Sequence, residues 1–390
     1  MGRAGAIRGK DLDLRILMLA LTNFELDTRV QREAQALVSA GHHVSVIALA
    51  GLSTGQGVEV IGVGPVSAVG GGGRASKGRF RWLKRMARWL LLPHHEARIR
   101  RSFLRPAAAA AGGLVFDVVH AHDFKTLGLG ARLAASRGAR LVYDSHECWT
   151  GRNHGGRPTP LQDRRDLSRE RLLARGAHAV ITIGPRLADW LRATQGLRDV
   201  RVVRNTFPDL GASSAPSAPR APAGVVYAGN LHAGRDLHTF AAAARSLGTA
   251  VRCVALGPGT PNRELSGLEV LAAVPVDAVD TLYQELGLAL VPLEDNCLNH
   301  RLALPNKLFH ALRAGVPVVA ADLPQLRDFV STEGVGVLYE PGNADSLVGA
   351  IRDALSRYSE LAEAVRRVRE RHLWDVDRGV LLDLYAGIAA

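Results

Sequence analysis

The chain of 390 residues is long enough for two domains, each with its own hydrophobic core. Hydrophobic residues make up 47% and charged residues 22%, and no apolar run approaches the ~18 residues of a membrane-spanning helix, which excludes an integral membrane protein. The formal net charge of +12 favours polyanionic partners, and the lack of a secretory h-region leads us to expect a cytoplasmic chain.

The first half alternates the patterns of strands and helices. A short apolar run at 15–20 predicts a buried strand, and apolar residues at helical spacing predict a helix from Thr28 to Ala40, with Gly41 as its C-cap. Further strands are predicted at 42–49, 57–63, 117–123, 139–147, 178–184 and 200–205. This alternation predicts a doubly wound parallel sheet.

A segment rich in Ser, Ala and Pro at 208–223 interrupts the alternation and predicts an interdomain linker. The second half then restarts, with strands predicted at 224–229, 251–257, 268–274, 288–293, 316–322 and 334–340. We therefore expect an α/β protein in which two Rossmann-like domains, 1–207 and 224–372, face each other across a cleft.

One stretch, residues 70–105, does not fit the alternation and carries eleven basic residues against the single acid Glu96. Apolar residues from Phe80 to Leu90 fall on one helical face, flanked by Trp82 and Trp89. Two interpretations stay open. Such a helix can contact an anionic membrane peripherally through 74–105, or its apolar stripe can pack on the domain.

Polar residues gather where two of the predicted strands end, which is where open α/β sheets bind ligands. These residues are His120, His122, Asp123, Asp144, His146 and Glu147. The HxH and HxE pairs could together form a zinc site, but neither has the i, i+4 spacing of helical ligands and no cysteine accompanies them. We therefore expect no bound metal.

The second half offers an anion site. Arg235 and Lys307 come at the starts of predicted helices, where unpaired N–H groups and the helix dipole favour negative charge. Gly257 and Gly259 follow a strand directly, and glycines there let the backbone approach a ligand closely. This combination favours a diphosphate.

Several segments resemble a known enzyme family. They are "DTRVQREAQALVSAGHHVSVIA", "DVVHAHD", "LVYDSHE", "LPNKLFHALRAGVPVVAADLPQLRDFV" and "GVGVLYEPGNADSLVGAI". Together they resemble the retaining, nucleotide-sugar-dependent glycosyltransferases of the GT-B fold (family 4, glycosyl transferases group 1), from about residue 14 to 388. The resemblance implies that the nucleotide lies on the C-terminal domain and the acceptor on the N-terminal one. It also implies that a helix within 373–390 crosses back to the first domain.

The resemblance also assigns roles to residues. His122 matches the cleft histidine near the transferred sugar, and Arg235 and Lys307 match cations around the diphosphate, so these three are expected to be catalytic. The family needs neither a metal nor another cofactor, and its front-face attack requires no protein nucleophile. The donor side is expected to comprise Gly229, Asn230, Arg235, Gly257, Gly259, Leu302, Ala303, Leu304, Asn306, Lys307 and His310. The acceptor side is expected to comprise Phe24, Asp27, Asp123, Asp144, His146 and Glu147.

The sequence departs from the family pattern at three positions. Leu302 and His310 stand where two glutamates are usual, and Asn230 stands where arginine is more common. A neutral imidazole accepts one hydrogen bond and donates one, so we expect His310 to face the ribose with altered recognition; core packing is the alternative. Leucine cannot bond the sugar as a glutamate does, so we expect backbone amides of 302–305, or Asn296, Asn299 or Glu294, to bind it instead.

The leading hypothesis is sugar transfer from a nucleotide-sugar donor to the hydroxyl of a glycan, a lipid-linked compound or a natural product. One alternative is a nucleotide-sugar epimerase on the same fold, which would need cleft carboxylates as acid and base. Another is a degenerate transferase acting as a binding or partner subunit, motivated by Leu302 and His310. No nucleic-acid partner is expected, because the basic stretch lacks the context of a known reader.

Overall fold

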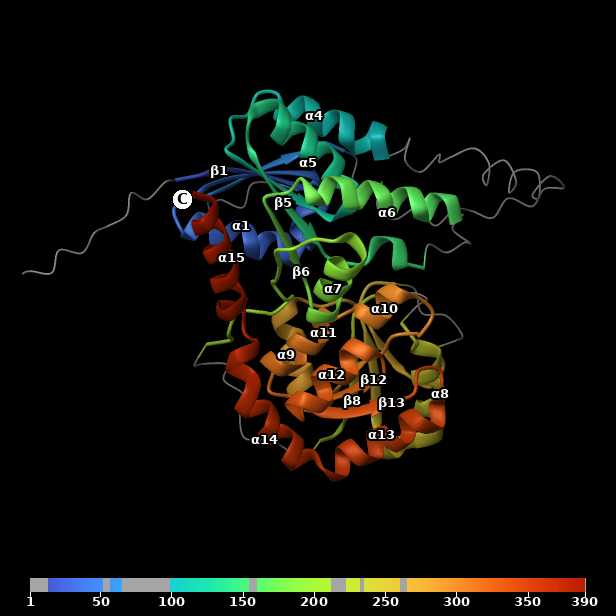
Figure 1. Cartoon of the computed structure of the whole chain (residues 1–390). Helices are drawn as coiled ribbons and strands as arrows, with labels where there is room; N and C mark the ends of the chain where they lie inside the picture. Colours follow the sequence, from blue (N-terminus) through green and yellow to red (C-terminus); the bar gives the residue numbers. More distant parts are fainter. Residues whose placement is uncertain are drawn as a thin grey trace, which may run out of the picture.

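The structure, a computed structural model, describes residues 13–51, 57–64, 99–153, 160–211, 222–231, 235–259 and 265–389. It contains two parallel sheets, one in each half of the chain, and Figure 1 shows the first half above the second. Each predicted strand is present within the expected range or close to it. The expected α/β fold of two Rossmann-like halves is confirmed.

The first sheet has seven strands in the order β3-β2-β1-β4-β5-β6-β7. Their bounds are β1 Arg15–Asn23, β2 His43–Ala50, β3 Val58–Gly62, β4 Val118–His122, β5 Arg140–Ser145, β6 Ala179–Thr182 and β7 Val200–Val202. Every pairing is parallel. The strand order reverses between β1 and β4, and the crevice at such a switch point is where doubly wound sheets bind ligands.

Helices cover both faces of this sheet. On one face, α1 (Thr28–Ser39) and α15 (Trp374–Ala389) share an apolar cluster with β1 and β2. The helices on the other face are η3 (Arg100–Leu104), α4 (Arg105–Ala111), α5 (Asp123–Arg137), α6 (Pro160–Arg175), α7 (Pro185–Trp190) and η5 (Leu191–Gln195). The strands are thus buried on both sides, which explains why they read as continuous apolar runs.

The second sheet has six parallel strands in the order β10-β9-β8-β11-β12-β13. Their bounds are β8 Gly224–Ala228, β9 Arg252–Leu256, β10 Glu269–Leu271, β11 Gly287–Val291, β12 Val318–Ala321 and β13 Gly336–Tyr339. The surrounding helices are α8 Leu237–Leu247, α9 Val276–Leu286, α10 Leu298–Leu302, α11 Asn306–Arg313, α12 Pro324–Glu333, α13 Ala344–Ser356 and α14 Tyr358–Val368. One apolar cluster spans the strands and most of these helices.

The chain passes between the two halves twice, and the two crossings are hydrogen-bonded to each other. Helix α15 runs from the second half up to α1 of the first, as the red ribbon in Figure 1 shows, which confirms the expected return of the C-terminal helix. Asp377 at its start accepts hydrogen bonds from the Arg204 backbone N–H at 2.8 Å and from Thr206 Oγ1 at 2.8 Å. Trp374 N–H donates to the carbonyl of Phe207 at 2.9 Å.

The halves also touch across the cleft. Arg186 on α7 forms a bidentate pair with Asp328 on α12, at 2.5 and 2.9 Å, and its backbone N–H donates to Gln325. The Cys148 N–H donates to Asn299 Oδ1 at 2.8 Å. These contacts hold the first half against α10 and α12, with the cleft between them.

Two predicted segments lie largely outside the described residues. The basic stretch 70–105 is described only from Ile99 on, where Phe103 is buried in the core of the first half. Of the linker 208–223, residues 212–221 are not described. Among the helices that the structure describes, none combines the length and apolar character needed to cross a membrane.

Candidate functional site

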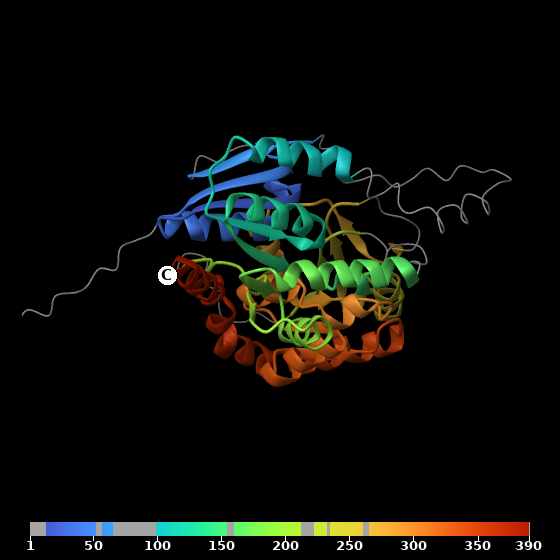
Figure 2. The same cartoon turned by 45° about the horizontal axis from the view of Figure 1, so that its top comes forward.

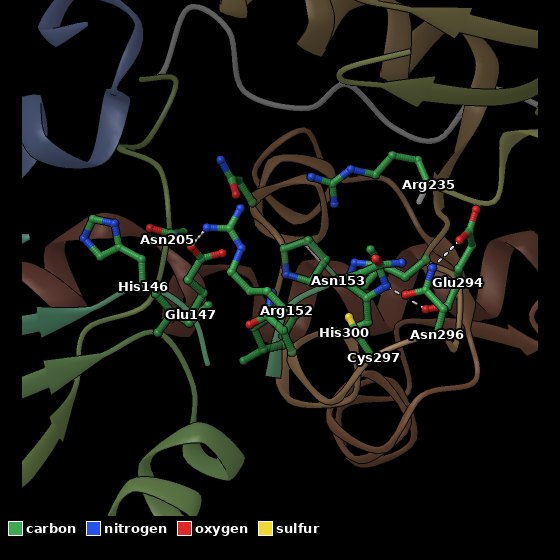
Figure 3. Close-up of a pocket in the computed structure, with 17 residues that line it drawn as sticks. His146, Glu147, Arg152, Asn153, Asn205, Arg235, Glu294, Asn296, Cys297 and His300 are labelled. Carbon is green, nitrogen blue, oxygen red and sulfur yellow. Dashed lines mark hydrogen bonds and ion pairs between the residues drawn. The ribbon is translucent and has the colours of Figure 1, made fainter. Parts of the chain in front are cut away.

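A cavity of about 480 Å³ lies between the two halves, at the carboxyl ends of the strands of both sheets. The first half contributes His146 and Glu147, which follow β5, and the second half contributes Arg235 and Glu294. Figure 3 shows these two pairs on opposite sides, with Arg152 and Asn153 between them. The other lining residues are Ile183, Asn205, Leu293, Asn296, Cys297, Asn299, His300, Ala303, Leu304, Pro305 and Asn306.

One cation of the second half, Arg235, lines this cavity, and a second, Lys307, directly follows the lining residue Asn306 without itself being among the lining residues. No described residue forms a hydrogen bond or ion pair with the guanidinium of Arg235. The Lys307 ammonium lies 5.2 Å from the centre of the Tyr227 ring, and no described carboxylate pairs with it. Burial, together with the charge of Arg235, lowers the pKa of Lys307 to about 7. An anion bound between Arg235 and Lys307 would restore the lysine's charge, because an opposite charge favours the ammonium form.

Glycine makes this arrangement possible. Gly229, directly after β8, has φ +153°, and a Cβ there would lie 2.7 Å from Lys307 Nζ. Gly257, after β9, has φ +146°, and a Cβ there would collide with the backbone of Gly229. Gly259, with φ +139°, would meet Leu231 Cβ at 2.9 Å. Larger residues at these positions would be strained, and one at Gly229 would collide with the Lys307 side chain.

Asp236 was missed from the sequence, although it fixes the backbone directly after Arg235. Its buried carboxylate accepts hydrogen bonds from Tyr339 Oη at 2.9 Å, from the Gly342 N–H at 3.0 Å and from Thr239 Oγ1 at 2.5 Å. Asp236 and Asp123 have φ +53° and +65°, and no other described non-glycine residue has positive φ. Asp236 precedes α8, and Asp123 begins α5 directly after β4; strain of this kind gathers at functional sites. The residues "RDL" (Arg235 to Leu237), which follow a predicted strand, were the feature of the sequence that could have identified Asp236.

The polar cluster of the first half is organised around Asp144, which is fully buried. Arg29 from α1 donates two hydrogen bonds of 2.9 Å to this carboxylate and lies 3.0 Å from Glu33. Burial opposes ionisation, but the charges of Arg29 and His146, together with hydrogen bonds from His122 and His146, outweigh it and hold the pKa of Asp144 well below its usual value. Arg29 thus neutralises a carboxylate at the end of β5, a role that local sequence patterns could not reveal.

The two histidines of this cluster lie beside Asp144. His146 Nε2 is 2.7 Å from its Oδ2, and His122 Nδ1 is 3.2 Å from the same oxygen. Burial alone would lower the pKa of His146, but Asp123 and Asp144 raise it well above its usual value. His146 is therefore an imidazolium at neutral pH on the wall of the cavity. His122 does not line the cavity, and its buried Nε2 has no hydrogen-bond partner among the described residues.

Glu147 is the acidic group of the first half that lines the cavity. Its Oε1 accepts from Arg152 Nη1 at 2.5 Å. Burial, reinforced by the charge of Asp123, raises the pKa of Glu147 to about 7 even though Arg152 lies beside it. A carboxyl poised near neutrality in a cleft can act as a proton donor or acceptor.

Four buried residues bring possible metal-ligand atoms within 4.8 Å of one another: Glu33, His120, His122 and Asp144. The guanidinium of Arg29 already lies 2.9 to 3.0 Å from both carboxylates, so a cation is in place there. His120 Nδ1 is also engaged, at 2.9 Å from Tyr385 Oη on α15. The donor set is thus better explained by an internal ion-pair network than by a metal site.

His310 does not lie where the sequence prediction placed it. It is buried on α11, with Nε2 3.0 Å from Asp280 Oδ1 on α9 and its ring stacked on Phe207 at 4.8 Å, and it does not line the cavity. The structure therefore favours the packing alternative over the expected ribose contact. The buried carboxylate of Asp280 attracts the imidazole because it needs a donor inside the protein.

Three other expected contacts also differ. Leu302 turns away from the cavity into the apolar cluster of the first half, while Ala303, Leu304 and Asn306 line the cavity as expected. Phe24 is buried among the core residues of the first half, so it cannot touch an acceptor from this position. Asp27 caps α1 by accepting from the Val30 N–H at 3.1 Å, which supports loop ordering over acceptor contact.

Asn230 is exposed and, like Gly257 and Gly259, is not among the lining residues. Its carbonyl accepts a hydrogen bond from Tyr227 Oη at 2.7 Å, and this bond fixes the backbone beside Lys307. Asn230, Gly257 and Gly259 therefore shape the backbone near Lys307 and do not line the cavity themselves.

Two family models together match most of the chain. The model of the glycosyl transferase 4-like domain matches residues 26–206, and that of glycosyl transferases group 1 matches residues 222–357. A search of curated protein sequences found no match.

Solved structures match nearly the whole chain. Sucrose-phosphate synthase from Thermosynechococcus elongatus is 15% identical, with a TM-score of 0.68 over 96% of this chain and 99% of that one. HepE from Anabaena in complex with UDP is 14% identical, with a TM-score of 0.68 over 96% and 100%. A glycosyltransferase from Rickettsia africae is 12% identical, with a TM-score of 0.66 over 96% and 98%. At these identities the likeness establishes a shared fold. The chain belongs to the glycosyltransferases of the GT-B fold that join a glycosyl transferase 4-like domain to a glycosyl transferases group 1 domain.

Proposed function

We propose that the protein is a retaining glycosyltransferase that moves a sugar from a nucleotide diphosphate to an acceptor hydroxyl without a metal ion. The observation that carries the proposal is the pair Arg235 and Lys307, two cations without a described carboxylate partner, beside the first turn of α11. A buried cation with no counter-ion is costly, and a diphosphate supplies the missing charge. HepE has been solved with UDP and with UDP-glucose, which makes a uridine donor the first to try.

In the proposed reaction the bond between the sugar C1 and the diphosphate oxygen breaks while the acceptor oxygen bonds to C1 from the same face. The acceptor proton passes to the departing phosphate, and the diphosphate leaves with the bonding electron pair. Arg235 and Lys307 stabilise the negative charge that develops on the leaving group, a role that a metal ion fills in other enzymes. His122 is the histidine that we assign to the sugar side; its Nδ1 lies 3.2 Å from Nε2 of His146, and His146 lines the cavity.

The test is the anomeric configuration of the product. The protein is incubated with a nucleotide sugar, first UDP-glucose, and the sugar released to water or to an acceptor is followed by proton NMR in the presence of EDTA. The proposal predicts that the first product keeps the donor's configuration and that EDTA leaves the rate unchanged. Inversion of configuration, or activity restored only by a divalent metal, would contradict it.

A second candidate is a partner subunit that binds without turnover. The observation in its favour is that Leu302 and His310, at positions usually held by donor-binding glutamates, turn away from the cavity. This candidate predicts weak nucleotide binding and no product unless another chain is added. Turnover by the isolated chain with any nucleotide sugar decides against it.

A further inference from the structure

A second hollow lies on the first half, outside the donor cleft. It has a volume of about 440 Å³ and runs between η3 and α4 on one side and α5 and α6 on the other. Helices α4, α5 and α6 lie side by side over one face of the first sheet, as Figures 1 and 2 show. We call this hollow the basic groove. Its lining residues are Ile99, Arg100, Leu104, Arg105, Ala108, Phe124, Lys125, Gly128, Leu129, Arg132 and Arg169.

The groove combines a cationic rim with an apolar floor. Five of its lining residues are basic and none is acidic. The four arginines are exposed, and none of them has an ion-pair or hydrogen-bond partner among the described residues. The apolar side chains, such as Leu104 on η3 and Phe124 and Leu129 on α5, form the floor between them. Four arginines without partners gather around one hollow that no acidic residue lines, and this concentration of positive charge favours an anionic ligand.

Gly128 on α5 contributes to the shape of the groove. A Cβ at this position would lie 3.0 Å from Arg169 Nη2, so the missing side chain lets the guanidinium from α6 lie against α5. Arg169 thus reaches over the groove from one wall while Arg132 is placed on the other.

The groove also adjoins the donor cleft. Phe124 lies 5.7 Å from the Trp149 ring, and Lys125 Nζ lies 4.3 Å from its centre. The guanidinium of Arg152, which lines the cleft, lies 5.0 Å from the same ring. Trp149 therefore contacts lining residues of both hollows, Phe124 and Lys125 of the groove and Arg152 of the cavity.

We propose that the basic groove binds an anionic lipid, with its phosphate among the arginines and the start of its chain on the apolar floor, and that this lipid carries the acceptor hydroxyl. The inference rests on the proposed glycosyltransferase activity and names its acceptor class. A free phosphate or an acidic glycan would use the cations but not the apolar floor, whereas an amphiphile uses both. Arginine forks match phosphate oxygens in geometry and charge.

Titration calorimetry with short-chain lipids tests the groove without a bilayer. The probe is dihexanoylphosphatidylglycerol below its micelle concentration, compared with dihexanoylphosphatidylcholine and with inorganic phosphate. We expect the anionic lipid to bind, and to bind about tenfold less tightly to the double variant Arg132→Gln/Arg169→Gln, a loss of about 1.4 kcal/mol. The variant Gly128→Leu, which fills the groove and favours the helix, should weaken binding similarly without a change of charge.

The matched control is Arg198→Gln/Arg352→Gln, which removes two exposed arginines that no described residue pairs and that do not line the groove. Circular dichroism confirms that each variant is folded. The proposal is overturned if the anionic lipid does not bind, or if the groove and control variants bind it equally. It is also overturned if phosphatidylcholine binds as tightly, or if inorganic phosphate alone binds as tightly and shows the same loss in the groove variant.

The same proteins are titrated with UDP, which separates the two proposals. If UDP binds and the lipid does not, only the assignment of the acceptor class is overturned. Absence of nucleotide binding, with lipid binding intact, would count against the transferase proposal and leave the groove as a lipid site.

Discussion

The charged residues of the cleft divide into pairs that are already neutralised and cations that are not. Arg29 is bound to Asp144 and Glu33, and Arg152 is bound to Glu147. Arg235 and Lys307 have no such partner among the described residues. The proposed diphosphate would therefore find its counter-ions on the second half of the chain.

Lys307 makes diphosphate affinity depend on pH. Its pKa is lowered to about 7 in the free protein and rises when a diphosphate binds beside it. Binding then takes up a proton above pH 7, so the affinity for UDP should fall by up to about tenfold per pH unit above that value. Calorimetry at pH 6.5 and 8.5, in buffers of different ionisation enthalpy, measures both the affinity and the proton uptake.

The variant Lys307→Met serves as the control, because it cannot take up this proton. It should bind UDP more weakly at pH 6.5 and show a smaller dependence on pH. An affinity in the wild type that does not change between the two pH values would contradict the role of Lys307.

Glu147, a residue of the cleft, should make the free energy of unfolding depend on pH. Its pKa is raised from the ordinary 4.5 to about 7, so the folded state holds this proton more tightly than the unfolded state. Its contribution to the free energy of unfolding is present below about pH 4.5 and is lost as the pH rises toward 7. In Glu147→Gln the decline over this window should be smaller, by on the order of 2 kcal/mol. Denaturant unfolding at pH 5 and pH 7.5 measures this decline. An identical decline in the wild type and in Glu147→Gln would argue against the raised pKa of Glu147.

At the scale of elements, the strand-to-helix loops carry the site. The start of α8 is tied to the end of β13 by Asp236, which accepts hydrogen bonds from Tyr339 and from the turn at Gly342. The loop after β5 is tied to the start of α5 by Asp123, which accepts from the His146 N–H at 3.1 Å. Each aspartate fixes the backbone next to a residue that lines the cavity.

Replacing Asp236 should affect stability and donor binding together. In Asp236→Ala, the buried Tyr339 hydroxyl and the Gly342 N–H lose their acceptor, which costs about 2–4 kcal/mol of unfolding free energy. The neighbouring Arg235 loses its fixed loop, so UDP affinity should fall as well. Urea unfolding and calorimetry measure the two effects, and unchanged UDP affinity in the folded variant would show that Arg235 is held by other contacts.

The junction between the halves depends on Asp377 at the start of α15. It accepts from Arg204 Nε at 3.0 Å and from Thr206, while only 1% of its surface is exposed. Asp377→Ala should lower the free energy of unfolding by about 3–5 kcal/mol, because it leaves Arg204 without its buried partner. The control Asp375→Ala, an exposed residue of the same turn, should change it by less than about 0.5 kcal/mol. Equal effects of the two substitutions would contradict this role.

At the scale of the whole molecule, the strands and their alternation with helices could be predicted from the sequence. Strands of a parallel sheet that is covered on both faces read as apolar runs, and such runs identified both sheets. The place of Arg235 on the cavity wall could be predicted as well, because this residue stands between a strand and the start of a helix. These features depend on the local sequence.

The rest depends on partners that are remote in the sequence. Arg29 and Asp144 are 115 residues apart, so only the folded sheet brings them together. His310 could have faced either the nucleotide or its own core. The packing of α11 against α9 and Phe207 decided this, since it places Asp280 within 3.0 Å of the imidazole. Leu302 turned toward the first half for a similar reason, because an apolar cluster was available across the cleft.

The measurement that tests the central claim most directly is the thermal stability of the protein with UDP, GDP, ADP, dTDP and CMP, and with the corresponding nucleosides. A ligand at a hundredfold excess over its Kd stabilises the native state by ~2.7 kcal/mol, which raises the Tm visibly. The account predicts that at least one nucleotide raises the Tm while its nucleoside does not, and that the shift shrinks in Arg235→Gln. If no nucleotide shifts the Tm of the wild type, or if Arg235→Gln shows the full shift, the cleft is not a diphosphate site.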